Sequence, residues 1–532
     1  MFLSKINKFI TTNTAFFILI TIIVFTLYGK SISFDFTYHD DDTLIINNVN
    51  YLSNIKNIPN LFLTSCYLSN NSFYYRPILN VSFATEIILF GLNTKIFHLT
   101  NIILFIFTIF LIYFFLSKLK LNKNILKFVC LIIAVHPVLT SCIVWIPGRN
   151  DTLLTIFICL SLINFVNYLD QNKIKFLLLH YLFFTIALFT KETTLLLIPM
   201  YIFFIYCFNY KITKQQIIKF LLILLPTIII YFILRHIAVT QIDFKEYILN
   251  WNEYVTNILT GIMTYIDKLI FPDYIPIMLH NIKISTSTII LNISVLFLLI
   301  FLYFKKITNR KITLFAIVWF VLLLLPTFFQ KEYIFLPHRL IIASIGIIII
   351  FTLAIAELIK RHTLLKKYFI IGYLIFFTMF LYLSYTQMNK YKKADVYWTN
   401  AYVDASDYHL VINGLAKVYL SIGDYNQYKY LIYESYRLSS GDRYIFDIIG
   451  ILLHEGNVTE AEKICLNILS DKNNKPFLKF GSLRTLGEIY FKKNDIKKAY
   501  LYTQEAYKLN PYDISISEKL GELNTILKNN KL

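Results

Sequence analysis

The chain has 532 residues, of which 57% are apolar and 17% aromatic, with a formal net charge of +19 and a mean hydropathy of +0.59. This composition excludes a soluble enzyme and predicts a polytopic membrane protein, because apolar runs long enough to cross a bilayer recur to about residue 387. The positive charge does not indicate a nucleic-acid partner, since the Lys and Arg residues lie mostly between the apolar runs.

Eleven apolar segments are predicted to span the membrane. Their approximate ranges are 9–28, 97–116, 125–145, 152–169, 176–190, 193–209, 218–234, 288–304, 313–329, 340–358 and 368–387. The first resembles a signal peptide but lacks a clear cleavage site, so we interpret it as an uncleaved span. Residues 253–271 carry one apolar helical stripe interrupted by Asp267 and Lys268, which is typical of a helix lying at the membrane interface.

The distribution of Lys and Arg between these segments predicts their orientation. Basic loops follow the second, fourth, sixth, eighth and tenth spans, and all of them are cytoplasmic if the N-terminus is cytoplasmic. The loop 29–96, the turns near 136–151, 191–192 and 329–339, and the tail after about residue 390 then face the other side. Because nucleotide sugars and ATP are cytoplasmic, an enzyme with its chemistry on that side is expected to use a lipid-linked donor.

Three consecutive carboxylates, Asp40, Asp41 and Asp42, lie in the first non-cytoplasmic loop. Adjacent like charges repel and raise one another's pKa unless a cation or a proton-bearing substrate group is near. A solvated loop or a helix N-cap is the ordinary alternative, since Asp before an apolar run is a common capping signal. A divalent cation, Mg²⁺ or Mn²⁺, held by the three aspartates is a further option, because hard oxygen ligands suit these ions.

Other polar residues recur at the non-cytoplasmic ends of the predicted spans. They are Arg76, His98, His136, Arg149, Asp151, Lys191, Glu192, His338 and Arg339. Ionisable groups there are costly to bury unless they are paired, so we expect them to converge on one site. Singly, each has an ordinary interpretation: a lone His is an interfacial residue, a lone Arg contacts a lipid phosphate, and Arg149 with Asp151 forms a structural ion pair and helix cap.

Residues 391–532 change in character and are predicted to form a second domain after the membrane domain 1–390. They are rich in Tyr, Lys and Glu, with helical periodicity. Six residues match the 34-residue tetratricopeptide pattern, and they are Leu486, Gly487, Tyr490, Ala499, Ala506 and Pro511. Weaker repeats begin near Leu415 and Glu455. Stacked repeats bury their apolar stripes against one another. Such an array offers a concave surface for a protein partner, or serves as a spacer or lid.

The order of these motifs resembles the GT-C class of membrane glycosyltransferases. The likeness rests on Tyr38 with the aspartates, Tyr74-Tyr-Arg-Pro, Phe97-His-Leu-Thr-Asn, His136-Pro, Trp145-Ile-Pro-Gly-Arg-Asn-Asp, Lys191-Glu and His338-Arg-Leu, followed by the repeats. It is strongest to bacterial tetratricopeptide glycosyltransferases and to the transmembrane and tetratricopeptide repeat O-mannosyltransferases. The resemblance implies an all-α fold, with about eleven spans followed by a tetratricopeptide-repeat α-solenoid.

The resemblance also implies a reaction. Such enzymes transfer a sugar, with inversion, from a polyprenyl-phosphate donor to an acceptor hydroxyl of a protein Ser or Thr or of an envelope glycan. Asp40 or Asp41 is the expected general base, and the register is open because His39 follows Tyr38. The leaving phosphate needs cations, for which Arg149, Lys191 and Arg339 are expected first and Arg76 next. His98 and His136 are expected to donate further hydrogen bonds.

Two residues depart from the family's pattern. Ser141 and Pro337 occupy positions where acidic residues are usual, which leaves Asp151 and Glu192 as the carboxylates that could substitute. Localisation in a bacterial inner membrane, with the repeats in the periplasm, is expected, or in the endoplasmic reticulum membrane of a eukaryote. A non-catalytic repeat scaffold for envelope assembly remains the alternative, whereas a transporter would require ionisable groups at mid-membrane depth.

Overall fold

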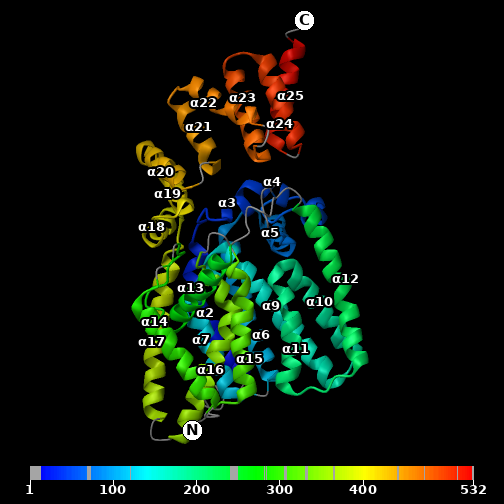
Figure 1. Ribbon diagram of the computed structural model, residues 1–532, viewed down its shortest axis with the longest axis vertical. Helices are drawn as coiled ribbons and strands as arrows, with labels where there is room; N and C mark the ends of the chain where they lie inside the picture. The colour runs from blue at the N-terminus through cyan, green and yellow to red at the C-terminus, as the bar shows by residue number, and fades with distance from the viewer. Residues whose placement is uncertain are drawn as a thin grey trace. The chain divides into compact units, whose positions relative to one another are not determined.

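The computed structural model describes residues 13–68, 74–119, 121–239, 250–280, 282, 284–304, 308–329, 334–362, 366–439, 442–471, 474–511 and 513–529. Over these residues the regular structure is helical, apart from one isolated antiparallel bridge between Leu279 and Phe335. The chain forms two compact units, Met1–Ala405 and Ser406–Leu532, whose helices are labelled in Figure 1. The predicted all-α class is confirmed, and the division falls later in the chain than the predicted boundary at residue 390.

Eight helices of the described residues are long and apolar enough to cross a membrane. The spans contain α2 (Asn13–Tyr28), α6 (Thr94–Lys118), α9 (Arg149–Gln171), α12 (Lys214–Ala238), α14 (Thr286–Phe304), α15 (Arg310–Leu324), α16 (Leu340–Arg361) and α17 (Lys366–Asn389). Four of them continue into adjoining 3-10 turns and reach their full length as Asn13–Ser33, Ile146–Gln171, Arg310–Phe328 and Pro337–Arg361. The chain is therefore an integral membrane protein. Helices α12, α14 and α17 expose most of their apolar side chains, as lipid-facing helices do.

The predicted count of about eleven spans is too high by this criterion. The segment predicted at 125–145 is a bent pair, α7 (Lys123–Val135) and Pro137–Val144, which meet at 58° and make a ninth span if they are counted as one. The break follows from Pro137, which lacks a backbone donor and holds His136 in an extended conformation. The segments predicted at 176–190 and 193–209 correspond to α10 (Ile174–Thr190) and Glu192–Phe208, which are shorter than a full span.

The predicted interfacial segment forms one continuous helix, α13 (Trp251–Ile270). Its first turn is capped by Asn250, whose side chain accepts a hydrogen bond from the backbone N–H of Glu253, while the Glu253 carboxylate accepts one from the Asn250 backbone N–H. Helix α13 is not among the eight candidate spans. Its location at the membrane interface stays a prediction.

The loop between α2 and α6 folds into a small layer of its own at one end of the first unit (Figure 1). It contains α3 (Asp41–Leu44), α4 (Val49–Leu52), several 3-10 turns and α5 (Pro77–Phe90). An apolar core holds this layer to α6 and to the turn before α9, and its residues include Phe36, Leu44, Ile45, Leu52, Leu61, Leu79, Phe83, Ile87, Phe97 and Ile146. The loop that carries the aspartate cluster is therefore held in place by a packed apolar core.

The turn before α9 sets the position of several predicted site residues. The η6 turn (Ile146–Gly148) packs so closely that a Cβ at Gly148 would lie 2.4 Å from the carbonyl oxygen of Ser141. Only glycine fits there without a shift of the backbone. Helix α9 begins directly after it and packs against α6 and α10, so Arg149 and Asp151 point into the protein interior and not into lipid.

The last helix of the first unit, α18 (Ala394–Asp404), follows α17 after a short turn. Its C-terminal residue, Asp404, accepts hydrogen bonds from the Tyr274 hydroxyl and, at 2.6 Å, from the backbone N–H of Ile277. The backbone N–H of Asp35 donates to the carbonyl of Lys392 at 3.0 Å. These contacts tie α18 to the segment after α13 and to the loop that carries the aspartates.

The second unit consists of helical hairpins. The pairs are α19 (His409–Ser421) with α20 (Tyr425–Leu438), α21 (Ile445–His454) with α22 (Val458–Ser470), and α23 (Pro476–Lys492) with α24 (Ile496–Leu509), and α25 (Ile514–Asn529) follows. A Cβ at Gly487 would lie 2.6 Å from Thr503 Oγ1, so the glycine permits the close approach of α23 and α24. The helices fall where the repeat pattern puts them, and the tetratricopeptide assignment itself stays a prediction.

Candidate functional site

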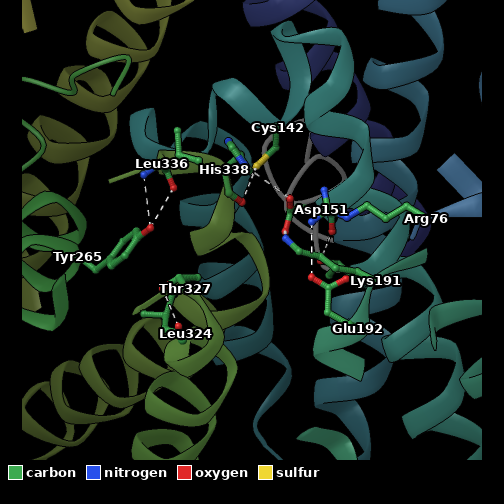
Figure 2. A network of polar contacts seen from close by, with 11 residues as sticks. Arg76, Cys142, Asp151, Lys191, Glu192, Tyr265, Leu324, Thr327, Leu336 and His338 are labelled. Atoms are coloured by element: carbon green, nitrogen blue, oxygen red, sulfur yellow. Dashed lines mark hydrogen bonds and ion pairs between the residues drawn. The ribbon is translucent and has the colours of Figure 1, made fainter. Parts of the chain in front are cut away.

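A buried ion pair joins two of the predicted site residues. Lys191 Nζ lies 2.7 Å from Asp151 Oδ1, and both side chains are at least nine-tenths buried (Figure 2). The other carboxylate oxygen of Asp151 lies 3.9 Å from His338 Nε2. Asp151 comes from the first turn of α9, Lys191 from the break after α10, and His338 from the short η10 turn (Pro337–Arg339). Three segments distant in sequence thus meet at one point.

A narrow cavity opens beside this pair. Its polar lining consists of Asp151, Lys191, Thr193, Thr327 and Arg339, and its apolar lining of Leu154, Ile158, Leu323 and Ile342. Two cationic side chains, Lys191 and Arg339, and one carboxylate, Asp151, line it. The surplus positive charge is of the sign that attracts an anionic group, while the cavity itself has room for only about one water molecule.

A second ion pair lies next to the first along the chain. Arg76 Nη2 is 3.6 Å from Glu192 Oε1, and the guanidinium stacks on the Tyr74 ring at 4.3 Å. The long separation leaves Arg76 less tightly held than Lys191 (Figure 2). Because Glu192 directly follows Lys191 in the chain, this pair lies beside the first.

The three aspartates have different environments. Asp41 is fully buried, and its Oδ2 accepts hydrogen bonds from the backbone N–H and the hydroxyl of Thr37, both at 2.6 Å. Burial raises the pKa of Asp41 to about 7. Asp40 is half-buried, and its backbone carbonyl accepts a hydrogen bond from the N–H of Leu44. Asp42 accepts a hydrogen bond from the N–H of Thr43.

A metal site on the aspartates does not fit this arrangement. Over the described ranges no group of three or more His, Cys, Asp or Glu side chains is placed to hold a metal ion. Thr37 already occupies one oxygen of Asp41, and Asp42 is bonded locally. We therefore assign no role to Mg²⁺ or Mn²⁺ at Asp40, Asp41 and Asp42.

Arg149 lies apart from the cavity, in a buried network. Its guanidinium is 0% exposed and pairs with Glu86 at 2.9 Å. Its Nε donates to Asn101 Oδ1 at 2.8 Å, and its Nη2 donates to the carbonyl of Phe97 at 2.9 Å. The alternative pairing of Arg149 with Asp151 is not found, because Arg149 pairs with Glu86 and Asp151 with Lys191. The network joins α5, α6 and α9, and nothing in it leaves the guanidinium facing a ligand.

The two predicted hydrogen-bond donors, His98 and His136, also pack into the structure. His136 Nε2 lies 2.9 Å from the carbonyl of Leu269, and its Nδ1 accepts a hydrogen bond from the N–H of Val138. His98 is buried on α6, with its ring edge-on to Phe34. Neither residue is among those that line the cavity. His136 is a hydrogen-bonded interior residue and His98 is enclosed in the interior, so neither is the interfacial residue of the ordinary interpretation.

Sequence reasoning missed several residues that organise the site. Glu86 and Asn101 hold Arg149, and Thr37 holds Asp41. Tyr397 bonds to His39, which the sequence marked only as an irregularity in the motif. The available signals were a lone Glu inside an apolar helix and an aromatic pair, Tyr397-Trp398, in a segment otherwise rich in charge.

Comparison with known proteins supports the resemblance. Residues 80–238 match the family described as dolichyl-phosphate-mannose-protein mannosyltransferase. The human Protein O-mannosyl-transferase TMTC1 is 30% identical over 182 residues, which covers 31% of this chain and 20% of the relative. The mouse protein of the same name is 30% identical over 182 residues, covering 31% of this chain and 19% of the relative. The chain thus matches these relatives over about a fifth of their length. The predicted likeness to the GT-C mannosyltransferases is confirmed.

Proposed function

We propose that this chain is a membrane glycosyltransferase that moves a sugar from a polyprenyl-phosphate donor to an acceptor hydroxyl on the non-cytoplasmic face. The observation that carries the proposal is the cavity that Lys191, Arg339 and Asp151 line, in a chain whose residues 80–238 match a mannosyltransferase family. The repeats favour a protein Ser or Thr as the acceptor over an envelope glycan, because such arrays suit extended peptides.

Lys191 and Arg339 are assigned to the donor phosphate. As the bond between the sugar C1 and the phosphate oxygen breaks, its electron pair passes to that oxygen, and the two cations stabilise the charge that develops there. Arg339 can bind a phosphate bidentately. Asp151 holds Lys191 in place and favours its protonated form. Arg149 is left out of this set, because its guanidinium is taken up by Glu86, Asn101 and the Phe97 carbonyl.

Asp40 is assigned as the general base in preference to Asp41. A base must reach the acceptor hydroxyl within about 3 Å, and the half-buried Asp40 carboxylate is accessible, whereas Asp41 is enclosed and bonded to Thr37. Asp40 takes the hydroxyl proton while the hydroxyl oxygen attacks C1 on the face opposite the phosphate, which inverts the configuration. Arg76 and Glu192, which pair with each other beside Lys191, are assigned to acceptor or sugar binding.

The experiment compares cells that carry the wild-type chain, Asp40→Asn or Asp273→Asn at matched membrane levels. Asp273 is a suitable control, because its side chain is 79% exposed and meets only Lys268, at 3.4 Å, among the ion pairs of the described residues. Mass spectrometry follows envelope glycopeptides, surface glycans and lipid-linked sugars. Asp40→Asn is expected to remove one glycoform and to accumulate its lipid-linked donor, with no change for Asp273→Asn.

A different outcome would favour the scaffold. If Asp40→Asn leaves every glycan fraction unchanged while deletion of the whole chain alters the cell envelope, the chain acts without this carboxylate. Truncation after Ala405 would then reproduce the deletion, because a scaffold depends on the second unit.

A further inference from the structure

The segment Tyr38-His39-Asp40 has an unusual backbone. Tyr38 has a φ of +54° and Asp40 a φ of +64°, so both neighbours of His39 are in the left-handed region that residues with a Cβ rarely adopt. An aromatic residue and an Asp hold this conformation only where the surroundings fix it, and such residues gather at functional sites.

Contacts of His39, through both its ring and its backbone, constrain the conformation of Tyr38 and Asp40. The ring stacks on Trp145 with centroids 5.1 Å apart and on Tyr397 with centroids 5.4 Å apart. The Tyr397 hydroxyl lies 2.6 Å from His39 Nδ1, and Trp145 Nε1 donates to the His39 carbonyl at 3.0 Å. Trp398 meets the same ring edge-on at 5.5 Å. His39 is therefore held from two sides, one residue before Asp40.

The two sides come from different parts of the first unit. Trp145 belongs to the turn before α9, and its ring also lies 5.0 Å from that of His338, which neighbours Asp151. Tyr397 and Trp398 belong to α18, which is fixed by the hydrogen bonds to Asp404. Trp145 and Tyr397, which together clamp His39, thus connect the loop that carries Asp40 with the phosphate cavity on one side and with α18 on the other.

We infer that His39 is a positioning residue, clamped by Trp145 and Tyr397, that fixes the backbone of Asp40 so that its carboxylate faces the acceptor. Helix α18 is then part of the transferase site and not only the connection to the second unit. The inference rests on the proposed function, since it assumes that Asp40 is the base. It assigns to Tyr397, 357 positions after Asp40 in the sequence, an effect on the rate of sugar transfer that acts through His39.

The test uses the purified full-length chain in liposomes with a polyprenyl-phosphate mannose donor. Tyr397→Phe keeps the ring but removes the hydroxyl, and Tyr402→Phe, on the same helix, is the matched control. Tyr397→Phe is expected to lower kcat about tenfold or more with little change in KM for the donor, because a displaced base slows the chemical step and not binding. Hydrogen exchange of residues 35–45 is expected to accelerate in Tyr397→Phe and to stay unchanged in Tyr402→Phe.

Wild-type kcat in Tyr397→Phe, or a lower kcat with unchanged exchange of 35–45, overturns the positioning role. If the wild-type chain transfers no sugar from any polyprenyl-phosphate donor while Tyr397→Phe still accelerates exchange, the proposed function fails and the clamp stands as a structural feature. Should Tyr397→Phe not fold, Trp145→Phe removes the donor to the His39 carbonyl and carries the same expectations.

Discussion

Replacing Arg149 with Met tests whether this residue of the Trp-x-x-Gly-Arg motif is structural. The guanidinium is 0% exposed, 2.9 Å from Glu86, and donates to Asn101 and to the Phe97 carbonyl. Its removal takes the ion-pair partner from a buried carboxylate and a charged donor from two buried acceptors. Breaking a buried ion pair by removing one partner costs roughly 3–5 kcal/mol. Arg149→Met/Glu86→Met removes both charges. We expect its loss of unfolding free energy to be smaller than the summed losses of the two single variants, by about 2 kcal/mol or more.

The assay is denaturant or thermal unfolding of the full-length chain in lipid nanodiscs. Arg361→Met is the matched control, because its pair with Glu357 at 3.0 Å is largely exposed and such pairs contribute about 1 kcal/mol or less. The interpretation fails if Arg149→Met unfolds like the wild type and instead raises KM for the lipid-linked donor. That result would return Arg149 to the phosphate site where the motif resemblance first placed it.

Three further predictions follow from the described contacts. Gly487→Val is expected to make residues 406–532 more sensitive to protease than residues 13–405, because the new side chain meets Thr503, and Gly487→Ala/Thr503→Ala is expected to recover much of the resistance. Burial raises the pKa of Asp41 from 3.8 to about 7, so between these pH values the folded chain holds a proton that the unfolded chain has released. Thermal stability should therefore decline as pH rises from about 4 to about 7 and then level off. Asp41→Asn should flatten this dependence. Lys191→Met alone should destabilise the fold by roughly 3–5 kcal/mol. Lys191→Met/Asp151→Asn should fold normally but bind the donor poorly. Normal donor binding by the double variant would remove Lys191 from the phosphate site.

Some local features of the chain could be predicted because local physics determines them. The close approach at Gly487 agrees with the small residue that the predicted repeat pattern expects there. The break at His136-Pro137 was missed, since 125–145 is predicted as one span, although the missing donor of proline accounts for it. The break at Lys191 was predicted, since it separates two apolar runs. Whether the short helices on each side cross the membrane depends on their length and tilt, which the apolar pattern leaves open.

Partners across the fold could not be predicted in the same way. The pairing of Arg149 with Glu86 depends on how α5 is rotated about its axis relative to α9, and no spacing in the sequence encodes that rotation. The contact between His39 and Tyr397 joins residues 358 positions apart, and it rests on the packing of α18 against the aspartate loop. The sequence indicated that charged groups converge on one site, but the division into structural and cavity-lining groups required the structure.

In the proposed reaction Asp40 acts as the base on a donor held by the cavity of Lys191 and Arg339. The most direct test measures sugar transfer from a radiolabelled polyprenyl-phosphate mannose to acceptor peptide by the purified full-length chain in liposomes, with donor binding measured in the same preparation. Asp40→Asn is predicted to bind the donor as the wild type does and to transfer its sugar about 10²- to 10⁴-fold more slowly. Transfer by Asp40→Asn at the wild-type rate would exclude Asp40 as the general base.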